Sequence, residues 1–204
     1  LARWLKANGT QVNRVALHAG DLHDCKAIRP VTYKGPRDGW GEYVRQLIAR
    51  HGVDCIVLFG QSRYYHVIAR EVAAESGIAV VVLEEGYFRP GFITMELDGV
   101  NGYSRTLQRF RWDHATGPES GIQADITPRH FEKMAWHASQ HYLAMHKHSA
   151  QFPHYRHHRG ANPYWYAAYW VKSWGIKLAR RWGDRRLQHR LFRERIPYFF
   201  VPLQ

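Results

Sequence analysis

The chain has 204 residues, of which 45% are hydrophobic, and a formal net charge of +12. This length and composition are those of one globular domain, or of one domain with an appendage. No stretch approaches the roughly 20 consecutive apolar residues of a membrane-spanning helix, and the start lacks both an initiator Met and a secretory signal pattern. We therefore expect a soluble or peripheral protein whose chain begins before Leu1. Cys25 and Cys55 lie far apart without CxxC spacing, which argues against a disulfide framework or a thiolate zinc site.

The first part of the chain alternates strand-like and helix-like segments. Three short, β-branched apolar runs predict buried strands, and the two segments between them repeat apolar residues at helical spacing. This order predicts βαβ crossovers in a Rossmann-like α/β sheet, whose ligands bind outside the carboxyl ends of the strands. The expected strands are residues 12–17, 55–59 and 78–83, and the expected helices are 40–51 and 64–76, with Gly52 and Gly77 as helix stops.

The pattern changes after the third predicted strand. A glycine-rich, irregular stretch covers residues 84–104, and a polar linker lies around 116–127. From Pro128 onward, apolar spacings of three and four predict one helix, and a second is expected over residues 164–182. The terminal YFFVPLQ has the composition of a strand that is cut off as it begins. We thus expect a Rossmann-like lobe over 1–115, a helical basic and aromatic segment over 116–195, and the start of a truncated second lobe over 196–204.

The strongest candidate for a site is EEGYFRPGFITMELDGVNGYS, residues 84–104, which follows the third predicted strand. Its first residues, Glu84 and Glu85, are expected to leave the carboxyl edge of the sheet. Because successive residues of an extended chain point to opposite faces, one acid can address a ligand cleft while the other pairs with Arg89 or Arg63. The alternative is a structured surface loop, since glycine-rich turns are common and define no general carbohydrate motif.

A second candidate is FGQSRYYH, residues 59–66, which follows the second predicted strand and leads into a helix. Ser62 suits the N-cap position, and Arg63 beside a helix start suits an anion. His66 either contacts a ligand or caps local polar groups. The loop HAGDLHD, residues 18–24, holds metal-binding residue types, but their spacing matches no known ligand pattern.

Eight histidines lie between residues 130 and 158, and those at 130, 137, 141 and 148 would share one face of a continuous helix. The pair His137 and His141 has the i, i+4 spacing of zinc ligands, but the glutamate of HExxH is missing. Because the histidine stripe flanks the apolar one, we favour the polar shoulder of an amphipathic helix over a metal site.

Residues 151–195 carry most of the charge, with eleven basic residues against Asp184 and Glu194, a net +9 of the formal +12. Such a field attracts anionic partners without choosing among phosphate backbones, lipid headgroups and acidic sugar nucleotides. Within it, YWYAAYWVKSWGIKLARRW combines aromatic and cationic residues, which suits nucleic-acid stacking or a helix lying on anionic lipid. The lipid interpretation is favoured because no nucleic-acid-binding motif surrounds the segment. An aromatic core helix with a basic solvent side stays open.

Four segments together resemble the capsule polysaccharide biosynthesis and export family, in particular its bacterial β-Kdo transferases of capsule lipid-anchor synthesis. They are FGQSRYYHVIA (59–69), EEGYFRPGFITME with GVNGYS (84–104), FPHYRHHR (152–159) and YFFVPLQ (198–204). The resemblance implies the N-terminal half of a two-lobed GT-B glycosyltransferase. In such enzymes a Rossmann-like N-terminal lobe faces the acceptor, and a C-terminal lobe, which this chain would lack, holds the CMP of the donor. The chain departs from the family pattern at Gln61, where Asp is common.

The resemblance also implies a reaction, the transfer of Kdo from CMP-Kdo to a phospholipid-type acceptor with retention. Glu85 would supply the active-site carboxylate, with support from Glu84. The implied substrate-binding residues are Arg63, His66, Arg89, Asn101 and Tyr103, and the guanidinium groups among them suit the Kdo carboxylate or an acceptor phosphate. No metal or cofactor is expected, because CMP-Kdo already carries an activated leaving group.

The expected partners are a CMP-activated sugar donor, a lipid-linked acceptor, an anionic membrane surface and other capsule assembly proteins, but not nucleic acid. The expected location is cytoplasmic, peripheral on the inner membrane. Two other classes stay open, a non-catalytic module for capsular polysaccharide binding or export, and a nucleic-acid-binding protein recognised by salt-dependent affinity for oligonucleotides.

Overall fold

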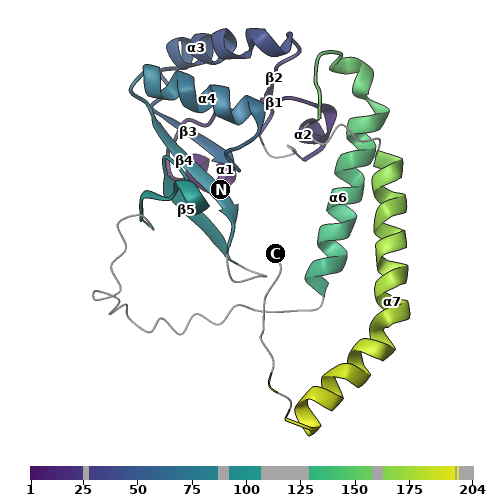
Figure 1. The fold of residues 1–204 in the computed structure, drawn as a ribbon. Coiled ribbons are helices and arrows are strands. Elements are labelled where there is room, and N and C mark those ends of the chain that lie inside the picture. The colour runs from purple at the N-terminus through teal and green to yellow at the C-terminus, as the bar shows by residue number, and fades with distance from the viewer. Residues whose placement is uncertain (25–27, 87–91, 107–128, 158–162, 196, 198–204) are drawn as a thin grey trace. The chain divides into compact units, whose positions relative to one another are not determined.

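The computed structural model describes residues 1–24, 28–86, 92–106, 129–157, 163–195 and 197 (Figure 1). The chain forms two compact units, Leu1–His158 and Arg159–Gln204, and each is described by itself. The described elements of the first unit include the helices α1 (Ala2–Ala7), α2 (Ala19–Asp24), α3 (Trp40–His51), α4 (Tyr64–Glu75) and α6 (Arg129–Lys147). Its described strands are β1 (Val15–Ala16), β2 (Val31–Thr32), β3 (Cys55–Phe59), β4 (Ala79–Glu85) and β5 (Ile93–Leu97).

The main sheet has the strand order β3-β4-β5. β3 and β4 run parallel, from Cys55 opposite Ala79 to Phe59 opposite Leu83, and α4 connects them as the sequence predicts. The third strand, β5, is antiparallel to β4 and was not predicted. It lies inside the stretch that we expected to be irregular. The fold is therefore mixed α/β, and its main sheet contains a parallel and an antiparallel pair. Within the stretch that we expected to be irregular, residues 84–85 and 93–97 belong to strands.

The first predicted strand pairs differently from our expectation. Only Val15 and Ala16 of residues 12–17 form a strand, and its described partner is β2, which runs parallel to it in a separate two-stranded sheet. The prediction of one parallel sheet built from the three predicted strands is thus wrong in its pairing. The two-residue β2 is exposed and too short to show a period of two, so the sequence held no signal for it.

Helices α3 and α4 end where the sequence predicts. Gly52 has φ +57° directly after α3, and Gly77 has φ +66° just after α4, both in the left-handed region that glycine tolerates. Figure 1 shows α4 along β3 and β4, with α3 packed on α4. The Trp40 indole N–H donates to the buried Tyr65 carbonyl at 2.8 Å and joins the two helices. Their core consists of Tyr33, Trp40, Val44, Tyr65, Ala69 and Val72.

The two faces of the main sheet differ in burial. On the side of α4, Val80 is 5% and Val82 0% exposed, and both pack against Ala73 and Val100. Alternate residues of the strands point to the other side, and most of them are apolar and exposed or half-buried in the described part of the unit. This open face carries Val57, Phe59, Ile93, Met95 and Leu97, which are between 42% and 64% exposed.

The helical segment that was predicted after Pro128 is confirmed as α6, which packs against α2. The described part of the second unit consists mainly of the helix α7 (Pro163–Arg193), which continues beyond the predicted end at residue 182 and includes Gly175 and Gly183. The predicted linker 116–127 and terminal strand 198–204 lie outside the described residues. Among the helices that are described, none has the length and apolarity needed to cross a bilayer.

Candidate active site at the carboxyl edge of the sheet

The two acidic residues singled out by the sequence are the last residues of β4. They do not leave the strand as expected, because pairing with β5 extends β4 to place Glu84 opposite Thr94 and Glu85 opposite Ile93. Successive strand residues point to opposite faces. Glu84 is half-buried and shares the α4 side with Val82, while Glu85 is exposed and shares the open apolar face with Leu83. The predicted division of the pair between two faces is thus present.

The turn after β3 lies beside Glu84. The Gly60 N–H donates to the Leu83 carbonyl at 2.7 Å, and Gly60 has φ +79°. A Cβ at Gly60 would lie 3.7 Å from Glu84 Oε2, so this backbone passes close to the carboxylate. Glu84 Oε1 also accepts a long bond of 3.4 Å from the Glu85 N–H. The carboxyl ends of β3 and β4 therefore meet at Glu84, the edge at which α/β sheets bind ligands.

Gln61 joins this edge to the loop that follows β5. The side chain is 6% exposed, its Nε2 donates to the Val100 carbonyl at 2.8 Å, and its Oε1 accepts from the Val100 N–H at 3.1 Å. An amide can donate and accept at once, whereas an ionised carboxylate can only accept. The departure from the family pattern at Gln61 thus has a structural role in this chain.

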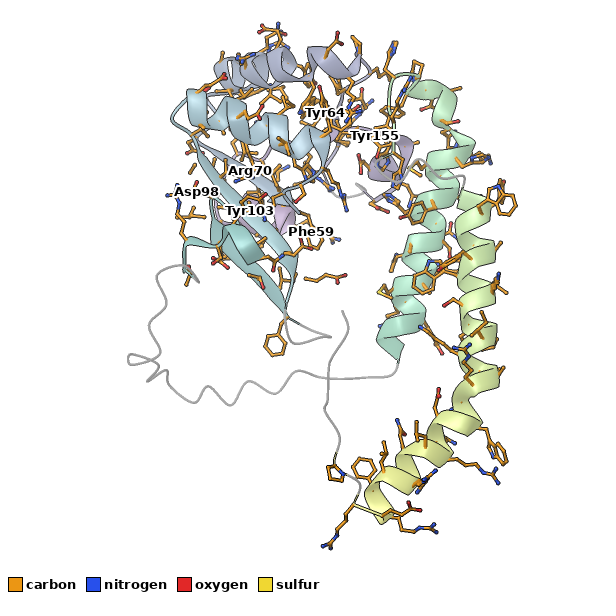
Figure 2. All side chains as sticks on the ribbon, in the orientation of Figure 1. Phe59, Tyr64, Arg70, Asp98, Tyr103 and Tyr155 are labelled. Atoms are coloured by element: carbon orange, nitrogen blue, oxygen red, sulfur yellow. The ribbon has the colours of Figure 1, made fainter. Side chains whose placement is uncertain are left out.

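The predicted residues Asn101 and Tyr103 belong to the loop that Gln61 holds. Asn101 follows Val100 directly, has φ +55°, and begins a short 3-10 helix that ends at Tyr103. The Tyr103 side chain is 63% exposed, and the Arg70 guanidinium lies 5.9 Å from its ring centroid (Figure 2). Arg70 also donates to the Asp98 carbonyl at 2.7 Å, which ties the same loop to α4. Both residues are therefore presented by a loop that is anchored to β3 and α4.

The predicted anion-binding residues have different outcomes. Arg63, rather than Ser62, occupies the N-cap position of α4, so the predicted capping role of Ser62 is wrong. Arg63 is exposed and, within the described residues, forms no ion pair with Glu84 or Glu85. His66 lies half-buried in the first turn of α4. Arg89 lies outside the described residues.

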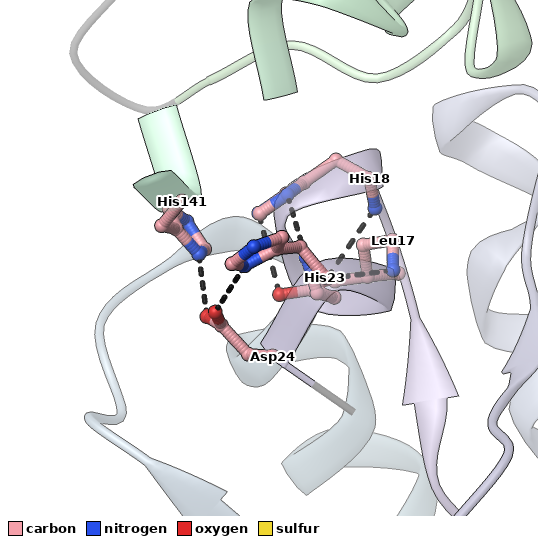
Figure 3. A network of polar contacts seen from close by, with 6 residues as sticks. Leu17, His18, His23, Asp24 and His141 are labelled. Carbon is pink, nitrogen blue, oxygen red and sulfur yellow. Dashed lines mark hydrogen bonds and ion pairs between the residues drawn. The ribbon is translucent and has the colours of Figure 1, made fainter. Parts of the chain in front are cut away.

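A polar network that sequence reasoning missed connects α2 to α6 (Figure 3). His18 Nδ1 accepts from the Asp21 N–H at 3.3 Å, while Asp21 Oδ2 accepts from the N–H groups of Leu17 and His18 at 2.8 and 3.3 Å. This reciprocal arrangement is a capping box at the start of α2. At the end of α2, Asp24 Oδ2 lies 2.7 Å from Nδ1 of His141, a residue of α6. His141 therefore contacts α2 through Asp24, a contact that the prediction of a polar shoulder did not include.

Two features explain how α2 and α6 approach so closely. A Cβ at Gly20 would lie 2.8 to 2.9 Å from atoms of the His141 ring, so a side chain at this position would force the imidazole to shift. Burial raises the pKa of Asp24, but hydrogen bonds from His141 and His23 outweigh it and hold that pKa below its usual value. Among the described residues, no group of three His, Cys, Asp or Glu side chains is arranged to hold a metal ion.

Tyr155, from the described part of the FPHYRHHR segment, packs near the end of β1 and the start of α4. The centroid of its ring lies 4.5 Å from that of His18, which follows β1, and 6.0 Å from that of Tyr65, in the first turn of α4 (Figure 2). Burial raises the pKa of Tyr155 and is also the main reason why the pKa of His18 is lowered, although Asp21 opposes the latter shift. Arg63 is close enough to act on both groups. Nothing in the sequence except the quoted motif indicated this position.

In the second unit, α7 does not have a single apolar face. Tyr169, Trp170 and Val171 are consecutive and 60% to 72% exposed, and consecutive helical residues point about 100° apart. Aromatic residues gather in the first half of the helix, and arginines gather from Arg180 onward. The Arg186 guanidinium lies 3.8 Å from the Trp182 ring centroid. Most of the aromatic residues thus precede the arginines along the helix axis, while Trp182 and Phe192 lie among them.

Comparison with known proteins gives a consistent picture. A family model described as "Capsule polysaccharide biosynthesis protein" matches residues 54–204. The chain is similar to the capsule polysaccharide modification protein LipB of Neisseria meningitidis serogroup B, with 33% identity over all of this chain and 50% of that protein. It is also similar to the capsule polysaccharide export protein KpsS of Escherichia coli, with 30% identity over 95% of this chain and 50% of that protein. The chain spans about half the length of these relatives, and no solved structure matches it.

Proposed function

The chain belongs to the capsule polysaccharide biosynthesis protein family, and from this premise we propose that it is the acceptor-side lobe of a GT-B-type glycosyltransferase. The proposed reaction transfers Kdo from CMP-Kdo to a phospholipid-type acceptor with retention. The observation that carries the proposal is the Glu84–Glu85 pair at the carboxyl end of β4, the central strand of the main sheet. The printed names of the relatives, which refer to capsule polysaccharide modification and export, support a role in capsule biosynthesis.

In this proposal Glu85 is the nucleophile because its carboxylate is exposed on the open side of the sheet. It attacks the anomeric carbon of Kdo, the bond from that carbon to the phosphate oxygen breaks, and CMP leaves with the electron pair. An acceptor hydroxyl then attacks the same carbon, loses its proton to a base and releases Glu85. Each displacement inverts the configuration, so the product retains it. Glu84 points to the opposite face and supports the strand end.

The residues around this edge supply binding groups in the proposed reaction. Arg63, His66 and Arg89 would bind the Kdo carboxylate or an acceptor phosphate, because cationic donors recognise both. Asn101 and Tyr103 would contact substrate from the loop that Gln61 anchors. The proposal needs no metal or cofactor, so transfer by the complete gene product should survive EDTA. Loss of activity that one divalent ion restores would contradict this part.

The test compares Glu85→Gln with Glu84→Gln in the complete gene product. Both changes keep side-chain size, and Kdo transfer from CMP-Kdo to a phosphatidylglycerol-type acceptor is measured beside a thermal melt. Glu85→Gln should melt like the wild type and lose transfer by at least about a hundredfold. Glu84→Gln should lower stability more than the rate. Near-normal turnover in Glu85→Gln would reject the assignment, and mass spectrometry that maps a Kdo adduct elsewhere would move the nucleophile.

We also propose that the basic part of the second unit lies on anionic lipid at the inner membrane. Between Arg180 and Arg195 the chain has seven arginines against Asp184 and Glu194. Each cation near an anionic surface contributes about 1 kcal/mol, and salt screens it. Sedimentation with phosphatidylglycerol vesicles should therefore exceed that with neutral vesicles and fall as salt rises. Equal binding to both vesicle types would contradict the proposal.

One specific observation favours a second function. The similar Escherichia coli protein is named for capsule polysaccharide export, which would suit a non-catalytic module that binds the polysaccharide. Consumption of CMP-Kdo by the complete gene product separates the two functions. An export module would leave CMP-Kdo intact while retaining affinity for the polysaccharide.

A further inference from the structure

The loop after β2, residues 33–39, has a shape fixed by its own sequence. Tyr33 is 8% exposed, and its hydroxyl donates to the Pro36 carbonyl at 2.5 Å. A Cβ at Gly35 would lie 2.8 Å from the same hydroxyl oxygen, so the turn closes tightly on the tyrosine. The next residue after Pro36 is Arg37. Because β2 is parallel to β1, the carboxyl ends of both strands lie at the same edge of their sheet. The loop after β2 leaves from this edge, and ligands of α/β sheets bind at such edges.

Arg37 is oriented by two contacts with Tyr64 of α4, a residue labelled in Figure 2. The guanidinium carbon lies 3.7 Å from the Tyr64 ring centroid, and the Tyr64 hydroxyl donates to the Arg37 carbonyl at 3.2 Å. Stacking uses the flat face of a guanidinium group, whereas its N–H donors lie in the plane of the group. The tyrosine therefore fixes the direction of Arg37 and leaves its donor edge available to an oxyanion.

A second arginine and a lysine lie near this position. Arg63 immediately precedes Tyr64 at the start of α4. Its charge acts on the Tyr155 hydroxyl and that of Arg37 acts on the Tyr65 hydroxyl, and the rings of these two tyrosines lie 6.0 Å apart. The Lys34 ammonium lies 5.8 Å from the Phe152 ring centroid. In the part of the chain that the structure describes, none of these three cations has a carboxylate within ion-pair distance. The three cations therefore form no ion pair with described residues.

We propose that Arg37 and Arg63 together bind a phosphate group, with Lys34 adding positive charge. A phosphate presents several acceptor oxygens and can take N–H groups from two guanidinium edges at once. The proposal rests on the proposed function for the identity of the molecule that carries the phosphate. That molecule is either the CMP moiety of the donor or the headgroup of the phospholipid-type acceptor, and the chemistry of recognition is the same for both.

The experiment measures binding, not transfer, in the complete gene product. Isothermal titration with CMP and with phosphatidylglycerol in detergent micelles is carried out on the wild type, Arg37→Gln and Arg50→Gln. Arg50 is a matched control because it is an exposed arginine in the last turn of α3. Arg37→Gln should weaken the binding of one probe by at least about tenfold, because it removes charge-assisted hydrogen bonds to the phosphate. Arg50→Gln should stay within about twofold, and the weakened probe identifies the source of the phosphate.

Two changes at Tyr64 test the orienting role of its ring. Tyr64→Phe keeps the ring and should keep most of the affinity, while Tyr64→Leu should resemble Arg37→Gln. Equal affinity of Arg37→Gln and the wild type for both probes would overturn the proposal, as would the absence of binding by the wild type. Normal transfer by Glu85→Gln would instead remove the proposed nucleophile and leave the effect of Arg37→Gln on phosphate binding unchanged.

Discussion

The buried amide of Gln61 gives the most direct test of how the candidate site is held together. We consider Gln61→Glu, which keeps the size of the side chain and replaces an N–H donor by an oxygen. In the wild type the amide donates to the Val100 carbonyl at 2.8 Å and accepts from the Val100 N–H at 3.1 Å. The introduced carboxylate retains only the second bond and places an oxygen against the carbonyl of Val100, a residue that is 0% exposed.

The geometry sets the size of the effect. No cavity is formed, so the cost comes from one lost bond and from a buried acceptor left without its donor, together about 2 to 3 kcal/mol at pH 7. The same contacts favour the protonated carboxyl, so the folded-state pKa of the introduced group should rise above its unfolded value. Stability is then greatest below the unfolded pKa and is lost as the pH rises through the folded one. The deficit of the variant should therefore shrink in mild acid.

The assay combines thermal melts of the complete gene product between pH 4.5 and 8 with hydrogen exchange of the peptide that contains Val100. Gln46→Glu is the control, because Gln46 is exposed and donates to Glu42 at 3.0 Å. That change adds a like-charge pair on a helix surface and should cost no more than about 0.5 kcal/mol. Equal melting of the two variants, or unchanged exchange at Val100, would refute the anchoring role of Gln61.

Two further predictions concern α2. Gly20→Ala should lower the free energy of unfolding by about 1 to 3 kcal/mol, because the added methyl would overlap the His141 ring, whereas Gly102→Ala has nothing within 4 Å and should be nearly neutral. Thermal melts of the two variants check this, and equal melting would contradict it. His18→Asn retains an acceptor for the Asp21 N–H and removes the imidazole. Burial lowers the pKa of His18. The wild type should therefore lose stability as the pH falls below about 6.5, the usual pKa of a histidine, and the variant should lose less in the same melts.

The strands of the main sheet show which sequence signals were sufficient. The apolar run of β3 and its following helix α4 were predicted because a buried parallel strand and an amphipathic helix have strong, separate patterns. The strand β5 also had a signal, since Ile93, Met95 and Leu97 alternate with polar residues. It was missed because the glycines around it were given more weight than this period of two. A hairpin partner for β4 could therefore have been predicted.

Other parts of the site carried no readable signal. The contact of Asp24 with His141 joins positions 117 residues apart, and no local pattern predicts which helix will meet α2. Gln61 could be recognised as unusual only through the family resemblance, and its partner Val100 follows an unpredicted strand. The helix α7 was predicted to end at residue 182, directly before Gly183. A glycine weakens a helix by about 1 kcal/mol, which a continuous run of good helix formers around it can offset.

The correction at β4 bears on mechanism. In the predicted loop, Glu84 and Glu85 would have lain beyond the last strand hydrogen bond and would have needed a ligand to order them. In the structure both residues are paired with β5 on one side, and β3 reaches as far as Leu83 on the other. A carboxylate on a paired strand is held in direction by the backbone, and such preorganisation lowers the cost of reaching a reactive geometry. Glu85 therefore combines a fixed backbone with an exposed side chain, and its replacement should affect chemistry far more than folding.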